Sequence, residues 1–229
     1  MKISVFIATS LDGFIARANG EIDWLPVGES EETGEDYGYQ EFIESVDFLV
    51  MGRNTDYSGA GMWDKYQTVV FYEPEDGYRF VSVSSAGLMK CNSCMNEKGI
   101  TLGAHFLFLN DTTADGISFT FLEFEIMKKA ASLAEAVTIV SDNPRAGAFA
   151  FLLTDGKTNE AAVIEASAGA VGVRAPQNGL LWETNMATTD QIKPFDVFLR
   201  NGIGKNPLAR FKRMQMLLDQ NKGRITAAL

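Results

Sequence analysis

The sequence predicts an α+β fold, and three observations lead to that prediction. Short apolar runs bounded by Gly, Asp and Asn recur along the chain and are typical of strands. Stretches with apolar residues at helical spacing lie between groups of such runs. The resulting order is strands, helices, a β-meander and a final helix, which differs from the strict strand–helix alternation of a parallel doubly wound fold. We therefore expect a layered arrangement of sheet and helices.

The first 57 residues are predicted to form a strand, a helix and a second strand. Residues 2–9 are apolar and β-rich, which indicates a buried strand. Residues 37–45 carry apolar side chains at helical spacing, which indicates a short amphipathic helix. Residues 48–51 are predicted to be a second short strand, and they lead directly into Gly52-Arg53-Asn54-Thr55.

The middle of the chain combines hairpins with two predicted helices. Glu75-Asp76-Gly77 and Asp155-Gly156-Lys157 each separate two apolar runs, so each marks the turn of a hairpin. Ser132 and Glu135 form the capping-box pattern that opens a helix. The predicted strands are residues 68–72, 80–83, 100–109, 149–154 and 161–166, and the predicted helices are residues 119–129 and 132–141.

The last part of the chain is predicted to contain two more strands and a long helix. Residues 170–174 and 180–183 are the strands. Asn206 as N-cap followed by Pro207 at the first helical position predicts the start of the helix. It runs to about Asn221, with Gly223 just past its end.

Composition and charge exclude several classes of function. The chain has 30 Asp and Glu against 20 Lys and Arg, so it lacks the excess of basic residues that nucleic-acid binding requires. Its apolar runs are too short to span a bilayer, and its first residues lack the basic flank and cleavage site of a signal peptide. Two cysteines, Cys91 and Cys94, cannot form a disulfide framework or complete a zinc site. We expect a cytoplasmic protein with no metal site and with neither a nucleic acid nor a membrane as partner.

Residues 1–57 carry one family resemblance. The opening from Lys2 to Ala16, and the later blocks Gly20-Glu21-Ile22-Asp23-Trp24-Leu25 and Val50-Met51-Gly52-Arg53-Asn54-Thr55, resemble the start of bacterial dihydrofolate-reductase-like proteins. That group includes the riboflavin-biosynthesis reductase domain. The resemblance implies that Gly52, Arg53 and Thr55 would hold a phosphate of NADPH, because glycine allows close approach and arginine adds charge at a helix N-terminus. The rest of a nicotinamide-cofactor site does not follow in the sequence.

Residues 52–229 carry a second and longer resemblance. The blocks Gly52-Arg53-Asn54-Thr55-Asp56-Tyr57, Met95-Asn96-Glu97-Lys98-Gly99 and Thr184-Asn185 resemble, in this order, blocks of the acyl-CoA:6-aminopenicillanic-acid acyltransferase and bile-salt/penicillin-amide hydrolase family. That family belongs to the N-terminal-nucleophile hydrolases. The resemblance implies part of an αββα sandwich, truncated at both ends and preceded by the reductase-like strand–helix–strand segment.

The second resemblance also implies a set of catalytic residues. Arg53 and Asp56 would orient the nucleophile and the substrate, and Asn185 and Arg210 would support the oxyanion and the amine. His105 falls near the position where relatives often have an asparagine of the oxyanion hole. Each of these residues also has a structural interpretation: an ion pair for Arg53 with Asp56, a turn cap for Asn185, a core histidine for His105, and a solvated basic helix face for Arg210 with Lys212 and Arg213.

The nucleophile of that family is missing from the sequence. The family mechanism uses a cysteine freed at the chain N-terminus, whose own α-amino group acts as base because it titrates near neutral pH. No cysteine precedes Cys91, and the reductase-like segment occupies the region where the nucleophile is expected. We therefore hypothesise that segments of two families are joined at Gly52-Arg53-Asn54-Thr55.

These observations give one leading hypothesis and two alternatives. The leading hypothesis is an amide hydrolase or acyltransferase of the N-terminal-nucleophile type, acting without a cofactor on a non-peptide carbon–nitrogen bond of a small-molecule amide, or on a thioester. The missing cysteine implies that its activity is impaired. The alternatives are an NADPH-dependent reductase and a non-catalytic chimera or remnant. The sequence leaves the acyl group of the substrate and the formation of homo-oligomers open.

Overall fold

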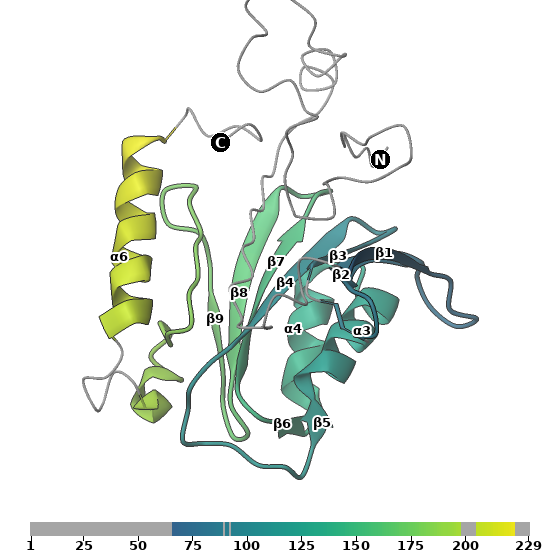
Figure 1. Cartoon of the computed structure of the whole chain (residues 1–229), viewed down its shortest axis with the longest axis horizontal. Helices are drawn as coiled ribbons and strands as arrows, with labels where there is room; N and C mark the ends of the chain where they lie inside the picture. Colours follow the sequence, from purple (N-terminus) through teal and green to yellow (C-terminus); the bar gives the residue numbers. More distant parts are fainter. Residues whose placement is uncertain (1–65, 89, 92, 198–204, 223–229) are drawn as a thin grey trace, which may run out of the picture.

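The computed structural model describes residues 66–88, 90–91, 93–197 and 205–222. Most of the strands form one antiparallel sheet of seven strands in the order β1-β2-β3-β4-β7-β8-β9 (Figure 1). They are β1 (Gln67–Tyr72), β2 (Phe80–Ser85), β3 (Ser93–Asn96), β4 (Ile100–Phe106), β7 (Phe149–Asp155), β8 (Glu160–Ala166) and β9 (Val171–Arg174). A mainly antiparallel sheet with separate helices confirms the predicted α+β class.

Two helices cover one face of this sheet (Figure 1). α3 (Phe119–Lys129) contacts β3 and β4, whereas α4 (Leu133–Asp142) contacts β7, β8 and β9. A short parallel pair, β5 (Ile117–Ser118) and β6 (Arg145–Ala146), forms a second sheet of two strands. α6 (Lys205–Gln220) lies near β9, on the side of the sheet away from α3 and α4 (Figure 1).

The main hydrophobic core lies between the sheet and the two helices. Leu102 of β4 and Phe151 of β7 are fully buried against Leu122 and Ile126 of α3. Burial of each such side chain contributes about 1.5–3 kcal/mol to stability. The central strands are therefore firmly held, and the segments that leave their ends carry the candidate site.

α4 begins as its capping sequence predicts. The side chain of Ser132 accepts a 3.2 Å hydrogen bond from the N–H of Glu135. The carboxylate of Glu135 in turn accepts a 2.6 Å hydrogen bond from the N–H of Ala131. These two bonds satisfy backbone donors at the start of the helix, which is the purpose of a capping box.

A smaller core lies on the opposite face of β7 and β8. It joins Ala150 and Val163 of these strands to Ala187 and Ile192, which belong to the segment after β9. That segment ends in the 3-10 helix η1 (Lys193–Phe195). A 2.8 Å hydrogen bond from the N–H of Ala187 to the carboxylate of Asp196 fixes it further. Residues 180–197 are thus held against the sheet.

Several predicted elements are confirmed by the structure. Both hairpins form, and α3, α4, β9 and α6 lie within a few residues of their predicted bounds. α6 begins at Lys205, so the proposed N-cap Asn206 lies inside the helix. The strand predicted to end at Leu109 ends at Phe106, and Leu109 makes an isolated bridge with Asp196 instead.

One strand prediction was wrong, and one strand of the large sheet was not predicted. Residues 180–183 do not form a strand, because Asn178 and Gly179 turn the chain back and leave only a bridge between Gln177 and Leu180. β3 was not predicted, since its four residues include polar ones that give no apolar run. The elements predicted at residues 2–9, 37–45 and 48–51 lie outside the described residues, as does Gly223.

The described residues contain neither a membrane-spanning helix nor a cluster of metal-binding side chains. No helix among them is both long and apolar enough to cross a membrane. In the same part of the chain, no group of three or more His, Cys, Asp or Glu side chains is placed to hold a metal ion.

Candidate functional site

Asn185 and Arg210 are brought together from different parts of the chain. Nη2 of Arg210, in the second turn of α6, donates a 3.0 Å hydrogen bond to Oδ1 of Asn185. Nδ2 of Asn185 donates a 2.9 Å hydrogen bond to the backbone carbonyl of Phe106 at the end of β4. Arg210 is half-buried, whereas Lys212 and Arg213 are exposed, so the predicted solvated basic face describes those two residues and not Arg210.

His105 lies next to this contact, on β4. Its Nε2 atom is 3.9 Å from Oε1 of Glu183, and the side chains of His105 and Glu183 are 23% and 1% exposed. This Nε2 atom is buried and has no hydrogen-bond partner within the part of the chain that the structure describes. His105 is therefore a half-buried histidine beside a fully buried carboxylate.

Arg174, the last residue of β9, organises the next part of the site. Its Nη2 donates to Oε2 of Glu183 at 2.7 Å and to the carbonyl of Trp182 at 2.5 Å. Its Nε donates to Oγ1 of Thr188 at 2.8 Å. The guanidinium also lies 5.9 Å from the ring centres of both Trp182 and Phe211. These contacts fix the plane of the guanidinium as well as its position.

A buried carboxylate holds the loop on which Thr188 lies. Glu165, fully buried on β8, accepts hydrogen bonds from the N–H groups of Thr188 and Thr189 at 2.8 and 2.9 Å. Both threonine hydroxyl groups donate to the same carboxylate. The loop packs so closely on β9 that a Cβ at Gly172 would lie 2.1 Å from Oγ1 of Thr189. The absence of a side chain at position 172 is therefore a requirement of this packing.

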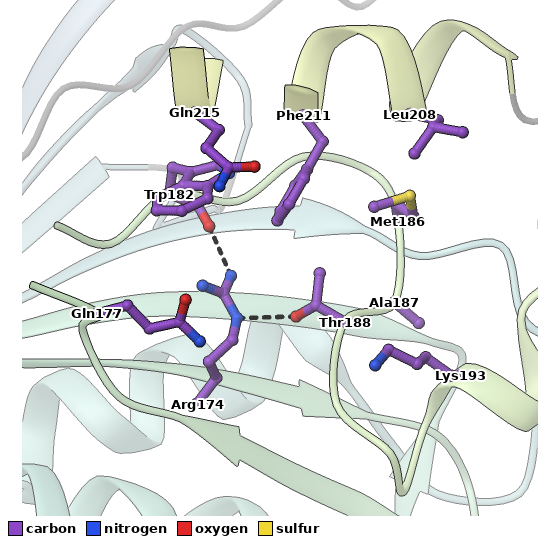
Figure 2. A pocket seen from close by; sticks show the side chains of 10 residues that line it. All are labelled: Arg174, Gln177, Trp182, Met186, Ala187, Thr188, Lys193, Leu208, Phe211 and Gln215. Carbon is purple, nitrogen blue, oxygen red and sulfur yellow. Dashed lines mark hydrogen bonds between the residues drawn. The ribbon is translucent and has the colours of Figure 1, made fainter. Parts of the chain in front are cut away.

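A cavity of about 350 Å³ lies between β9, the segment after it and α6 (Figure 2). Leu208, Phe211 and Gln215 contribute one face of α6 to its lining. Met186 and Phe211, which line it, directly follow Asn185 and Arg210 in the sequence, so the cavity adjoins that pair. The complete lining is Arg174, Gln177, Trp182, Met186, Ala187, Thr188, Lys193, Leu208, Phe211 and Gln215.

The structure places only part of the predicted site. Asn185 and Arg210 meet, and His105 lies one residue from Phe106, which Asn185 contacts. Arg53 and Asp56 lie outside the described residues, and so do Gly52 and Thr55 of the predicted NADPH-phosphate site.

Arg174, Glu183 and Trp182 were not identified from the sequence as site residues. One signal was available for Glu183: a carboxylate at the end of an apolar run must find a partner if it is buried. The partner itself, Arg174, lies nine positions earlier and is brought close by the turn at Asn178 and Gly179, which sequence spacing does not reveal.

Neither cysteine is placed to act as a nucleophile. Cys91 and Cys94 are both buried and carry free thiols. A hydrogen bond to Cys94, together with burial, raises the pKa of the Cys91 thiol above its ordinary value. A thiol that stays protonated is a poor nucleophile.

Asn96, in the middle of the Met95-Asn96-Glu97 block, is a structural residue in this protein. Its Nδ2 donates to the carbonyls of Met127 and Ala130 at 3.0 and 2.8 Å, which ties β3 to the end of α3. Its Oδ1 accepts from the N–H groups of Lys98 and Ile100 and closes the turn into β4. All the hydrogen-bonding positions of this buried amide are thereby used internally.

Comparison with protein families identifies a match over most of the chain. Residues 44–228 match the family described as acyl-coenzyme A:6-aminopenicillanic acid acyl-transferase. Among curated proteins, the chain is 46% identical over 54 residues to the uncharacterized protein YwjB of Bacillus subtilis, which is 24% of this chain and 29% of that protein. It is 31% identical over 130 residues to an uncharacterized protein of Archaeoglobus fulgidus, which is 55% of this chain and 22% of that protein. The matched segments thus span less than a third of either relative.

Solved structures with partial similarity include a bile acid hydrolase and a penicillin acylase. A variant of conjugated bile acid hydrolase from Clostridium perfringens gives a TM-score of 0.37 at 12% identity, covering 50% of this chain and 44% of that one. A second mutant of the same hydrolase gives 0.39 at 14% identity, with 49% and 44% covered. Penicillin V acylase from Agrobacterium tumefaciens gives 0.36 at 21% identity, with 43% and 33% covered.

Proposed function

Because this chain belongs to the acyl-coenzyme A:6-aminopenicillanic acid acyl-transferase family, we propose that it acts on the acyl carbon of a small-molecule amide or thioester. The reaction is hydrolysis or acyl transfer at a non-peptide carbon–nitrogen bond. It requires no cofactor, because moving an acyl group between nucleophiles neither oxidises nor reduces the substrate.

The hydrogen bond between Asn185 and Arg210 carries this proposal. The oxygen of an attacked carbonyl gains negative charge, and donors already aimed at it stabilise that charge. Nδ2 of Asn185 has two hydrogens, and the bond to Phe106 uses one of them. The second is available to an oxyanion, while Arg210 fixes the other end of the amide and adds positive charge nearby.

The attacking thiol is the open part of this proposal, because Cys91 and Cys94 are the two cysteines of the sequence. Cys91 and Cys94 are buried in the core and are excluded by their positions. We propose that this chain supplies the oxyanion-binding and positioning groups, and that its own turnover is impaired for lack of a thiolate. An external thiol should then restore part of the reaction.

The test uses phenylacetyl-4-nitroanilide with the full chain, with and without 2-mercaptoethanol. Attack by the thiol forms a carbon–sulfur bond, breaks the carbon–nitrogen bond and releases 4-nitroaniline, which takes up the proton. We expect release of 4-nitroaniline to rise with thiol concentration beyond the rate of thiol alone. Asn185→Ala should lower this rate by about 100-fold, the usual effect of removing one oxyanion donor.

Two controls make the result specific. Asn221→Ala removes an asparagine just beyond the end of α6, which hydrogen-bonds within its own turn, and should leave the rate unchanged. Octanoyl-4-nitroanilide, which carries a linear acyl chain in place of the phenylacetyl group, tests whether the choice of acyl group limits the result. If neither probe reacts faster with protein than with thiol alone, or if Asn185→Ala has no effect, the proposed function is wrong.

A further inference from the structure

We infer that Cys91 and Cys94 form an oxidation site, at which a low-molecular-weight disulfide converts the two thiols into an intramolecular disulfide. Both thiols are free and buried, and they are the two cysteines of the sequence. The proposed acyl chemistry uses neither of them, so this inference is independent of it. Three observations about their surroundings favour a reaction of the two thiols with each other.

The first observation is that Ser82 of β2 holds both cysteines in place. Oγ of Ser82 donates a 2.9 Å hydrogen bond to the backbone carbonyl of Lys90, the residue before Cys91. Cys94 is the partner of Ser82 in the antiparallel ladder between β2 and β3. Ser82 is itself buried in the fold. One buried residue therefore limits how far apart the two cysteine backbones can lie.

The second observation is that α3 also fixes Cys91. The N–H of Cys91 donates a 2.9 Å hydrogen bond to Oε2 of Glu123, a fully buried residue of α3. Both cysteines belong to the hydrophobic core between the sheet and the helices. Two reactants that are already ordered lose little further entropy when they react with each other. The folded chain should therefore favour the disulfide more than the unfolded chain does.

The third observation is that the two side chains meet. The thiol of Cys91 is hydrogen-bonded to the thiol of Cys94, so the two sulfur atoms lie next to each other. Cysteines whose side chains point apart cannot be bridged without movement of the backbone, and this pair does not have that obstacle. Burial and the same hydrogen bond raise the pKa of the Cys91 thiol. A thiol of high pKa is a poor leaving group, so the disulfide should be reduced slowly once it has formed.

The reaction needs one oxidant, for which glutathione disulfide serves. The thiolate of one cysteine attacks a sulfur of glutathione disulfide, and one glutathione thiolate leaves. The thiolate of the other cysteine then attacks the mixed disulfide, forms the sulfur–sulfur bond between Cys91 and Cys94, and displaces the second glutathione. Two protein thiols are oxidised, one glutathione disulfide is reduced, and the two protons of the protein thiols pass to the glutathione thiolates.

The experiment equilibrates the full chain with mixtures of reduced and oxidised glutathione, both in buffer and in urea that unfolds it. Each sample is then denatured in excess N-ethylmaleimide, and mass spectrometry counts the labels. Two labels report the dithiol, no label reports the disulfide, and a glutathione adduct reports the mixed disulfide. We expect the folded chain to become half-oxidised at an about tenfold lower proportion of oxidised glutathione than the unfolded chain, without accumulation of the mixed disulfide.

Two variants of β2 test whether the geometry causes this preference. Ser82→Ala removes the bond to the carbonyl of Lys90 and should lower the advantage of the folded chain by about threefold or more. Ser84→Ala is the matched control, because Oγ of Ser84, two positions along the strand, is buried and has no hydrogen-bond partner among the described residues. It should leave the advantage unchanged.

Three results would overturn the inference. They are equal oxidation of the folded and unfolded chains, accumulation of the mixed disulfide in the folded chain, and equal effects of Ser82→Ala and Ser84→Ala. The first two are measured on the parent protein, so they decide the question even if Ser82→Ala does not fold. Because the disulfide is expected to favour the folded state, the oxidised protein should also unfold at a higher urea concentration than the reduced protein; a lower concentration would contradict the assignment.

Discussion

Arg210 and Asn185, 25 positions apart in the sequence, are joined by a 3.0 Å hydrogen bond that links α6 to the segment after β9. Asn185 in turn bonds the backbone of Phe106 at the end of β4. The side-chain amide of Asn185 therefore connects β4 of the central sheet with α6. The same contact that fixes α6 also sets the direction of the remaining Asn185 N–H.

The two side chains should be energetically coupled. We expect Asn185→Ala and Arg210→Ala each to lower the free energy of unfolding, and the double variant to cost about 1 kcal/mol less than the sum, because the shared bond is lost only once. Urea unfolding of the four proteins of this cycle measures the difference. Pairing Asn185→Ala with Arg213→Ala, at an exposed position on α6, should give additive effects. Additivity in the Arg210 cycle would show that the bond contributes nothing in solution.

The elements that could be predicted from the sequence are those fixed by local chemistry. The turn at Asp155-Gly156-Lys157 and the Ser132 cap each depend on residues a few positions apart, and both form as expected. β3 could not be predicted in this way, because its pairing with β2 and β4 supplies the stabilisation that its own residues lack. A short polar strand in the middle of a sheet is held by its neighbours.

In the candidate site, too, some features could be predicted from the sequence and others depend on the folded chain. The types of Asn185 and Arg210 were given by the family resemblance, but their contact depends on where α6 lies. The cavity depends on Arg174, whose bonds to Thr188, Trp182 and Glu183 all form across the turn after β9. Residue type gives the chemistry of such a site, and only the folded chain gives its partners.

Arg145 is predicted to be a major contributor to stability. Its buried guanidinium donates to five carbonyls, two of them in the last turn of α4 and the others in the chain around Asn143 and Ser167. Arg145→Lys keeps the charge but cannot reproduce this planar set of donors. We expect a loss of about 3 kcal/mol in the free energy of unfolding. Arg79→Lys, on a side chain that is 67% exposed, should change it by less than about 0.5 kcal/mol; equal effects at the two positions would contradict the assignment.

Asn96→Asp should be strongly destabilising although the two side chains have the same shape. The carboxylate loses the two donated bonds and places an oxygen against the carbonyls of Met127 and Ala130. We expect a loss of about 2–4 kcal/mol by thermal or urea unfolding. Glu97→Gln, at the exposed neighbouring position, should leave the unfolding midpoint nearly unchanged. A mild effect of Asn96→Asp would mean that the amide does not hold α3 to β3.

Stability should fall above about pH 8.5 because of Cys91. Its hydrogen bond to Cys94 and its burial raise the pKa of the thiol in the folded protein, so the unfolded chain releases this proton first as the pH rises. The unfolded state then binds fewer protons than the folded state, and the free energy of unfolding decreases by up to about 1.4 kcal/mol per pH unit. Urea unfolding between pH 8 and about 9.5 avoids tyrosine titration. Cys91→Ala should remove this slope; an unchanged slope would assign it to another group.

Glu183→Gln should make the protein less stable. The Glu183 carboxylate is 1% exposed and pairs with Arg174 at 2.7 Å, so it compensates much of the positive charge beside the cavity. Removing that negative charge leaves Arg174 uncompensated, which should lower the free energy of unfolding by about 3 kcal/mol.

Urea unfolding of Glu183→Gln, Arg174→Met and the double variant measures the contribution of this pair. We expect the double variant to cost less than the sum of the two single variants, because the ion pair is lost only once. Lys193→Met is the control: its ion pair with Asp190 joins side chains that are 48% and 94% exposed, and its loss should change the free energy of unfolding by less than about 0.5 kcal/mol. If Glu183→Gln unfolds at the same urea concentration as the parent protein, the buried pair contributes nothing to stability.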